Sequence, residues 1–298
     1  MLKRLAIYLK GYEKYAVGSP LLVVLETGCE LVIPLLMAQI INKGIYGNSM
    51  TVIWQSGALM VLVALLATVI GGWAARCAAY AAQGLGANLR QAEFEKITAF
   101  SFADIDRFSS SSLITRLTND LTNIQNVAIM CLRVLIRGVT MTVASVILTL
   151  SLSPKLALVV CVVLPFMTAA LGLLMKICFP LFEKMQKTLD HLNETVQENL
   201  IAVRVVKSYV REDRERAKFM DANDGFTAAG MQAVLRMVAI QPVMMICFAV
   251  ATVLVLYNGG NMVLGGELEI GYLQTVIGYI MQILMSAMMI GMAVLQYT

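Results

Sequence analysis

Charged side chains are scarce in this sequence. Asp, Glu, Lys and Arg make up 14% of its 298 residues, whereas hydrophobic residues make up 59%. A soluble domain carries roughly 25% charged residues, so a chain this poor in charge cannot cover a surface that faces water. The mean hydropathy of +0.76 agrees with that conclusion. The composition therefore predicts that lipid surrounds much of the fold.

The sequence also lacks the groupings that metal sites, disulfide frameworks and nucleophilic active sites need. His191 is the only histidine, and it stands in a charged stretch with no nucleophile beside it. The cysteines are isolated in apolar stretches without a CxxC pair, which favours buried, inert thiols. We therefore expect no catalytic, cofactor or metal site in this chain, and the modest net charge of +4 indicates no nucleic-acid partner. The cysteines are Cys29, Cys77, Cys131, Cys161, Cys178 and Cys247.

Long apolar runs are abundant, and six of them approach the length of about 20 residues that a spanning helix needs. The connections between these runs alternate in length, so the two long ones, about residues 76–133 and 178–233, lie on one side of the membrane. The short connections are Asn42–Thr51, Ser153–Lys155 and Asn258–Gly271. The predicted spans are Ala16–Ile41, Val52–Ala75, Val134–Leu152, Leu156–Ile177, Val234–Tyr257 and Tyr272–Thr298.

The positive charges predict the orientation. Only Lys43 and Lys155 fall in the short connections, whereas the other Lys and Arg residues lie before the first span, in the long connections or at their ends. Because cytoplasmic segments carry an excess of Lys and Arg, both termini and both long connections are expected in the cytoplasm. The chain is thus predicted to be a multi-pass protein of the cell membrane. The cations before the first span are Lys3, Arg4, Lys10 and Lys14.

The long connections read as helices. No proline occurs between Pro34 and Pro154 or between Pro180 and Pro242, and a structureless loop of this length is unusual in a compact fold. The serines of 108–112 favour a break, and 181–200 is charged and amphipathic. We therefore predict an all-α membrane protein with two helical stalks, each bent at a short helix that docks a partner. The alternative is a soluble appendage with its own core.

Two motifs in these connections resemble a known family. The first is Phe102-x-x-x-Asp106-Arg107-Phe108 followed by Leu113-Ile-Thr-Arg116-Leu-Thr-Asn-Asp120, and the second is Glu198-Asn-Leu-Ile-Ala-Val-Arg204-Val-Val-Lys207-Ser-Tyr209-x-Arg211-Glu212. They resemble the two intracellular loops of ATP-binding-cassette exporters of the bacterial multidrug half-transporter type. The likeness extends over essentially the whole chain. It departs at Ser111 and Ala202, where the family usually has glycine.

The resemblance implies a mechanism and partners. Coupling helices at about Ser110–Asp120 and Ile201–Tyr209 would dock on nucleotide-binding (ATPase) domains, whose ATP- and Mg²⁺-dependent closure moves the spans. A second half-transporter, identical or different, would complete a twelve-helix dimer. The residues implied to couple to the ATPase domain are Ser111, Leu113, Ile114, Thr115, Arg116 and Asp120 in the first loop, and Val203, Arg204, Val205, Val206, Lys207 and Tyr209 in the second.

The phosphate-loop pattern GxxxxGK[ST] is missing from the 298 residues. The chain is therefore expected to take part in ATP hydrolysis only together with a nucleotide-binding domain. We expect it to be the membrane half of a longer polypeptide, with a stand-alone permease and a separate ATPase as the alternative.

Polar groups inside the spans suggest a substrate pathway. Glu26 and Glu30 are four residues apart and share one helix face, and intramembrane charges face the bundle interior or a wet cavity. They would form an acidic patch that attracts cationic amphiphiles, or else pair with Arg76, Arg133 or Arg137. Methionines of the last span suit a promiscuous cavity, although ordinary helix packing explains them equally well. These candidates are Met281, Met285, Met288 and Met292, with Gln282 beside them.

The leading functional prediction is the membrane-spanning half of an ATP-driven exporter of hydrophobic or amphiphilic compounds. An ion-coupled secondary transporter or channel is the alternative, in which Glu26 and Glu30 would couple to ions. A membrane scaffold or receptor that uses its stalks only for binding is a third possibility.

Overall fold

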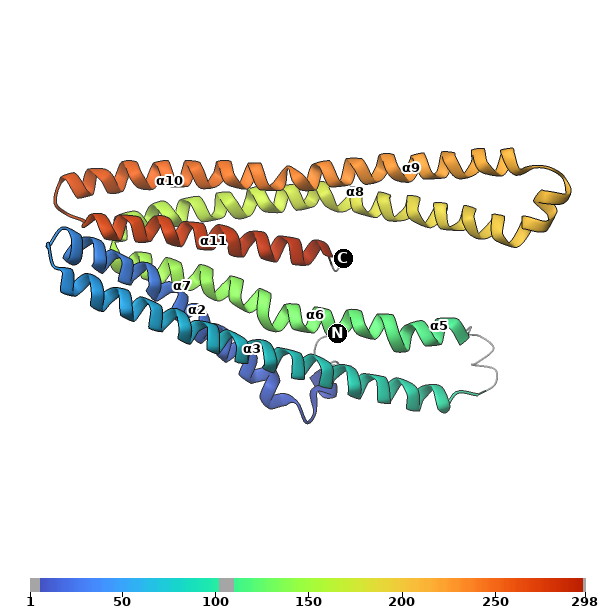
Figure 1. Ribbon diagram of the computed structural model, residues 1–298, viewed down its shortest axis with the longest axis horizontal. Coiled ribbons are helices and arrows are strands. Elements are labelled where there is room, and N and C mark those ends of the chain that lie inside the picture. The colour runs from blue at the N-terminus through green and yellow to red at the C-terminus, as the bar shows by residue number, and fades with distance from the viewer. Residues whose placement is uncertain (1–5, 102–109, 297–298) are drawn as a thin grey trace. The chain divides into compact units, whose positions relative to one another are not determined.

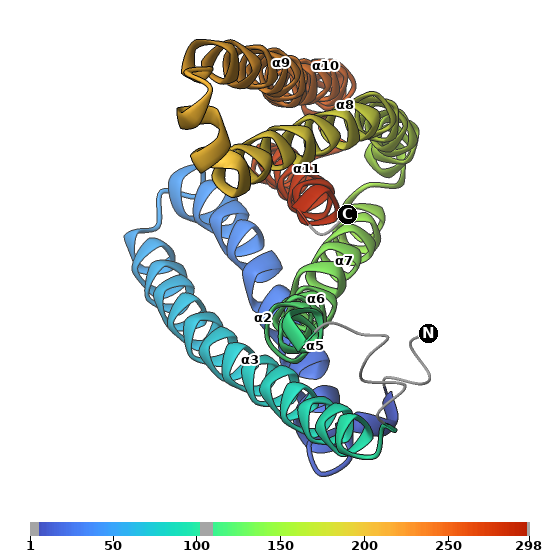
Figure 2. The same cartoon turned by 90° about the vertical axis from the view of Figure 1, so that its right-hand side faces the viewer.

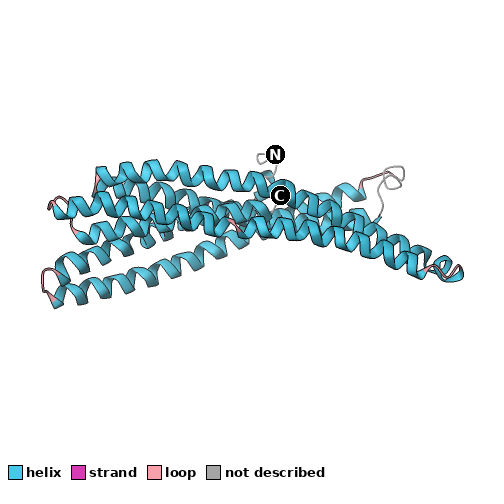
Figure 3. Cartoon of the chain, turned by 90° about the horizontal axis from the view of Figure 1, so that it is seen from above, coloured by secondary structure: helices cyan, strands magenta, loops and turns pink. Residues whose placement is uncertain are grey.

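The computed structural model describes residues 6–101 and 110–296, and these residues form helices joined by turns, without a strand (Figure 3). Six helices are long and apolar enough to cross a membrane. The all-α prediction with six spans is thereby confirmed, whereas the twelve-helix dimer stays a prediction. The six candidate spans are Glu13–Ile45, Met50–Thr98, Ser112–Leu152, Pro154–Ser208, Glu212–Leu264 and Ile270–Ala293.

The chain divides into two compact units. Within the described residues, the first unit runs up to Val163 and resumes at Val250, and the second is Leu164–Ala249. The elements are η1 (Ala6–Leu9), α2 (Glu13–Gln39), η2 (Ile40–Ile45), α3 (Met50–Thr98), α5 (Ser110–Thr115), η3 (Arg116–Asp120), α6 (Leu121–Met130), η4 (Cys131–Leu135), α7 (Ile136–Leu152), α8 (Pro154–Ser208), α9 (Glu212–Val238), α10 (Ile240–Leu264) and α11 (Ile270–Gln296).

In the first unit, α2 and α3 lie side by side (Figure 1). Small residues allow their backbones to approach closely, as is usual where helices pack in lipid. Ser19 is fully buried and donates its hydroxyl to the Ala74 carbonyl at 3.2 Å. Further along, Gly71 leaves room for Glu26, because a Cβ atom there would lie 2.6 Å from Glu26 Oε1.

Helices α2, α7 and α11 contact one another and meet at a core of Leu31, Met141 and Tyr279 (Figure 2). A second cluster joins α3 to α6 through Leu85 and Leu121 and also receives side chains of the N-terminal segment. The first cluster holds α2, which carries both intramembrane carboxylates, against α7 and α11.

The second unit is a helical hairpin in which the end of α8 lies against the start of α9 (Figure 1). Lys218 of α9 donates to Glu198 of α8 at 2.5 Å, and Asn199 donates to Glu215 at 3.3 Å. The first turn of α9 carries acidic residues, which the partial positive charge of a helix N-terminus stabilises. The long connections are thus helical stalks, as predicted.

The segments expected to form the short helices at the stalk tips are parts of longer helices. Ser110–Asp120 is the beginning of a continuous helix that reaches Leu152, with π turns at η3 and η4. Ile201–Ser208 is the bent end of α8 (Figure 1). Neither segment contains the proline or glycine that would interrupt a helix. The motif residues 102–108 lie outside the described residues.

Two boundaries also differ from those predicted. Helix α10 continues to Leu264, so the turn covers only Gly265–Glu269, and not Asn258–Gly271. Gly259, inside the predicted connection, lets Leu273 pack closely, since a Cβ there would lie 2.4 Å from Leu273 Cδ1. The fifth predicted span is divided at Ala239, three residues before Pro242, which lacks the N–H that a continuous helix would use.

Candidate functional site

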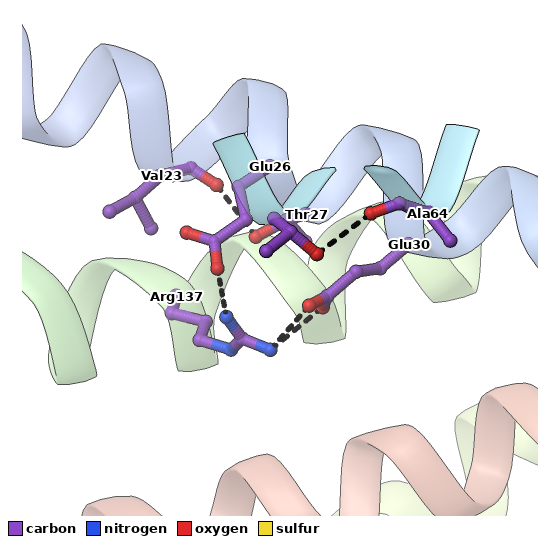
Figure 4. Close-up of polar contacts among 7 residues, drawn as sticks. Val23, Glu26, Thr27, Glu30, Ala64 and Arg137 are labelled. Carbon is purple, nitrogen blue, oxygen red and sulfur yellow. Dashed lines mark hydrogen bonds and ion pairs between the residues drawn. The ribbon is translucent and has the colours of Figure 1, made fainter. Parts of the chain in front are cut away.

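Glu26 and Glu30 of α2 share one arginine, Arg137 of α7 (Figure 4). Arg137 Nη1 donates to Glu26 Oε1 at 2.8 Å, and Nη2 donates to both carboxylate oxygens of Glu30 at 2.7 and 2.8 Å. The two carboxylates lie one helical turn apart, so a single planar guanidinium reaches both. Of the three arginines that the sequence offered as partners, Arg137 is the one that pairs.

We call Glu26, Glu30 and Arg137 the triad. When both carboxylates are ionised, the two carboxylates and one guanidinium together carry one net negative charge. Within the described residues, no further ion pair involves either carboxylate. The Glu26 side chain is 10% exposed, and its Oε2 has no hydrogen-bond partner. The triad is therefore incompletely neutralised.

A cavity of about 320 Å³ adjoins the triad. Its walls come from α2, α7 and α11, all in the first unit. The cavity is lined by Glu30, Ile33, Pro34, Arg137, Met141, Met281, Gln282, Met285, Ser286 and Met289.

The cavity brings together only some of the predicted pathway residues. Glu30, Met281, Gln282 and Met285 line it, whereas Glu26, Met288 and Met292 do not. The role of all these residues in a pathway stays a prediction.

Met289 was missed by sequence reasoning. Met281, Met285 and Met289 recur every four residues, and that spacing follows one face of a helix. The 4, 3, 4 spacing used for the prediction led instead to Met288 and Met292. The four-residue spacing of these methionines was visible in the sequence. The sequence alone did not indicate which face of α11 lies toward α2.

Two hydroxyls of α11 hold α2 at Pro34, beside the cavity. Tyr279 Oη donates to the Leu31 carbonyl and Thr275 Oγ1 to the Pro34 carbonyl, both at 2.9 Å. Pro34 has no N–H and cannot donate to the Glu30 carbonyl, so α2 loses one helical bond there. Both hydroxyl-bearing side chains are buried, and they fix α11 against the interrupted turn. We call these two bonds the Pro34 clamp.

The tip of the first stalk presents polar and apolar groups. Ile114, Thr115, Arg116 and Asp120 are exposed and Leu113 is half-buried, while the Ser111 side chain lies outside the described residues. Arg90 Nε of α3 donates to the Leu117 carbonyl at 3.4 Å and ties this tip to α3.

The tip of the second stalk is more apolar. Ile201 is 78% exposed and Tyr209 is 74% exposed. A groove of about 430 Å³ runs between α8 and α9, and Leu200 and Phe219 line it although sequence reasoning missed both. The predicted coupling residues Val203, Arg204, Val205, Lys207 and Tyr209 are exposed, and Val206 is half-buried.

The turn that follows this tip has an unusual backbone. Val210 has φ +51°, in the left-handed region. Its N–H donates to the Lys207 carbonyl at 3.3 Å, and the N–H of Arg211 donates to the Val206 carbonyl at 3.0 Å. This pair of bonds is the Schellman motif, whose left-handed residue is usually glycine. Valine is therefore strained at this position.

The family model of the ABC transporter transmembrane region matches residues 17–288. The chain belongs to this family. The uncharacterized ABC transporter ATP-binding protein YfiB of Bacillus subtilis (strain 168) is 32% identical over 272 residues, covering 91% of this chain and 48% of the relative. The uncharacterized ABC transporter ATP-binding protein Rv1273c of Mycobacterium tuberculosis (strain ATCC 25618 / H37Rv) is 28% identical over 292 residues, covering 98% and 50%.

A more distant relative has a named activity. An ATP-dependent lipid A-core flippase of Albidiferax ferrireducens (strain ATCC BAA-621 / DSM 15236 / T118) is 23% identical over 254 residues, covering 85% of this chain and 44% of the relative. This ABC transmembrane region spans about half the length of the curated relatives it matches.

The residues of this ABC transmembrane region do not fit ATP or Mg²⁺. A phosphate loop of the GxxxxGK[ST] type is absent from the sequence. Among the residues that the structure describes, no group of three or more His, Cys, Asp or Glu side chains could hold a metal ion.

Proposed function

We propose that this chain is the membrane-spanning half of an ATP-driven exporter of hydrophobic or amphiphilic compounds. ATP and Mg²⁺ bind in an associated nucleotide-binding domain, and a second half-transporter, identical or different, completes the pathway. Both termini and both stalk tips face the cytoplasm. The names of the similar proteins, which include an ATP-binding function, support the association with an ATPase domain.

The exposed tip of the second stalk carries the proposal. Large apolar side chains at the water-exposed end of a charged hairpin are unfavourable unless a partner covers them. Ile201, Tyr209 and Val210 are 78%, 74% and 81% exposed. A rigid hairpin that ends in such a surface can transmit a push from a bound domain to α8 and α9.

The methionine-lined cavity supports the substrate class. Methionine side chains are flexible and polarizable, so they adapt to apolar molecules of different shapes. The cavity volume of about 320 Å³ falls within the usual range for small-molecule sites. The shared carboxylates give this apolar site one strongly polar wall.

Cysteine crosslinking in the intact transporter tests the proposal. Arg116→Cys and Arg204→Cys are each paired with cysteines on the ATPase domain, and we expect crosslinks whose yield changes with bound nucleotide. The matched control is Glu194→Cys, an exposed position about 15 Å earlier along α8 at 1.5 Å per residue. Absence of nucleotide-sensitive crosslinks at both tips would count decisively against ATPase coupling.

An ion-coupled transporter or channel is the second candidate, and the net charge of the triad favours it. Carboxylates within a membrane often carry protons or ions. Transport by proteoliposomes that hold an imposed ion gradient and no ATP would support this candidate. Transport that needs ATP and continues after the gradient is abolished would exclude it.

A further inference from the structure

We propose that the cavity beside the triad binds a monovalent organic cation. The cationic group lies against Glu30 and Gln282, and the apolar body lies against the methionines of α11. This inference deepens the proposed function by naming the charge class of the substrate, and it rests on the chain being a transporter.

The net charge of the triad is the first argument. Arg137 places one guanidinium against two carboxylates, and Glu30 and Arg137 both line the cavity. A fixed negative charge next to apolar walls is poorly solvated, and its attraction for a cation is stronger there than in water. One positive charge on a ligand restores neutrality, whereas an anion would double the excess.

Unpaired acceptor atoms are the second argument. Gln282 Oε1 is buried without a hydrogen-bond partner, and so is Glu26 Oε2. Glu26 is 8% exposed as a whole residue. Buried oxygens without a donor are costly, and an N–H group of a cation bound in the cavity would satisfy the oxygen of Gln282, which lines it. Gln282 comes from α11 and the triad from α2 and α7, so acceptors approach the cavity from different helices.

The apolar walls are the third argument. Met281, Met285 and Met289 of α11 line the cavity with flexible thioether side chains. A site with one charged wall and one adaptable apolar wall matches a molecule with a charged group on a broad hydrophobic body. A small inorganic cation would leave the apolar wall without a function.

Two ions of the same shape and opposite charge provide the test. Tetraphenylphosphonium and tetraphenylborate are dialysed to equilibrium against the intact transporter in phosphatidylcholine nanodiscs without nucleotide, and binding to empty nanodiscs is subtracted. We expect saturable binding of the phosphonium. Glu30→Gln should weaken it about tenfold, as for the loss of one partly screened charge, and leave tetraphenylborate unchanged. Glu26→Gln, which also neutralises the triad, provides a second variant if the first does not fold.

Two further variants separate charge from shape. Gln282→Leu removes a hydrogen-bond acceptor, so it should weaken binding of a protonated aromatic amine several-fold and leave binding of tetraphenylphosphonium, which has no N–H group, nearly unchanged. Glu183→Gln on the exposed part of α8, where Glu183 pairs with Lys187 at 2.7 Å, should leave binding unchanged.

Equal subtracted binding of the two ions, or phosphonium binding that survives both glutamate variants, would overturn the inference. Because nucleotide is absent, such a result would leave the ATPase crosslinks unaffected, and the two proposals fail separately.

Discussion

Replacing Val210 with glycine is expected to stabilise the turn between α8 and α9. Three described turns have the same Schellman bonds, and each has one residue in the left-handed region. These residues are Gly266 with φ +74°, Asn48 with φ 50° and Val210 with φ 51°. Glycine and asparagine tolerate this region, whereas a β-branched residue does not. Val210 is thus the single misfit in a motif that the chain otherwise builds in the usual way.

The magnitude follows from two opposing terms. The left-handed conformation costs an L-residue roughly 1–2 kcal/mol, and valine belongs near the upper limit. Glycine loses more backbone freedom than valine on folding, and this entropy cost offsets roughly 0.5–1 kcal/mol of the gain in stability. The Val210 side chain is 81% exposed, so little packing is lost. The net stabilisation of the turn is therefore expected to be about 1–1.5 kcal/mol.

Hydrogen exchange of the turn amides measures this effect locally. Under conditions where exchange reports the population of the open turn, a gain of about 1–1.5 kcal/mol slows exchange of the Arg211 amide by about five- to twelvefold. Gly266→Ala is the matched reverse change, since it puts a Cβ on a left-handed residue in the same motif. It should accelerate exchange of the Glu267 amide by a similar factor.

Faster or unchanged exchange in Val210→Gly, with Gly266→Ala behaving as expected, would refute the assignment of strain to Val210. The strain is understandable if the exposed valine side chain contacts an ATPase domain, because strained residues are retained where they serve a site. The same variant should then lower substrate-stimulated ATPase activity while the turn becomes more stable.

Two further substitutions test the packing around the cavity. Tyr279→Phe removes the hydrogen bond to the Leu31 carbonyl, and the loss of about 1 kcal/mol should lower the thermal midpoint of unfolding in detergent. Tyr257→Phe, at an exposed position, is the control and should leave the midpoint unchanged. Equal midpoints for the two variants would show that the Pro34 clamp adds no stability. Gly71→Ala puts a Cβ 2.6 Å from Glu26 Oε1 and should destabilise by about 1–3 kcal/mol through overpacking. Gly72→Ala, with open space around its Cβ, is its control, and similar midpoints for the two glycine variants would contradict the close approach.

The spans and stalks were predictable because each is signalled by composition along a single segment. Long apolar runs indicate which segments lie in lipid. The lack of proline between residues 34 and 154 indicates that helices can continue beyond the membrane. The division at Ala239 was foreshadowed by Pro242. The uninterrupted α8 was missed because Ile201–Ser208 was assigned from family likeness, although its residues contain no helix breaker.

The details of the site depend on contacts between segments, which one sequence does not encode locally. Arg76, Arg133 and Arg137 were equivalent as partners until the rotation of α7 against α2 was known. Gly259 lies in the connection predicted at Asn258–Gly271, but its lack of a side chain allows Leu273 to pack closely against it. The phase of the methionine face was likewise set by where α2 and α7 meet α11. Tertiary packing decided each of these cases.

The triad contains one carboxylate more than an ion pair between two helices uses. A structural ion pair between α2 and α7 needs one carboxylate, and Glu26 meets that need with its 2.8 Å bond to Arg137. Glu30 adds a second negative charge within a span, where an ionised residue costs roughly 2.5–3.5 kcal/mol on insertion scales. Arg137 offsets only part of this, because the guanidinium is already shared. Glu30 makes two of the three bonds to Arg137 and also lines the cavity, so a cationic ligand bound there would meet the triad at this carboxylate.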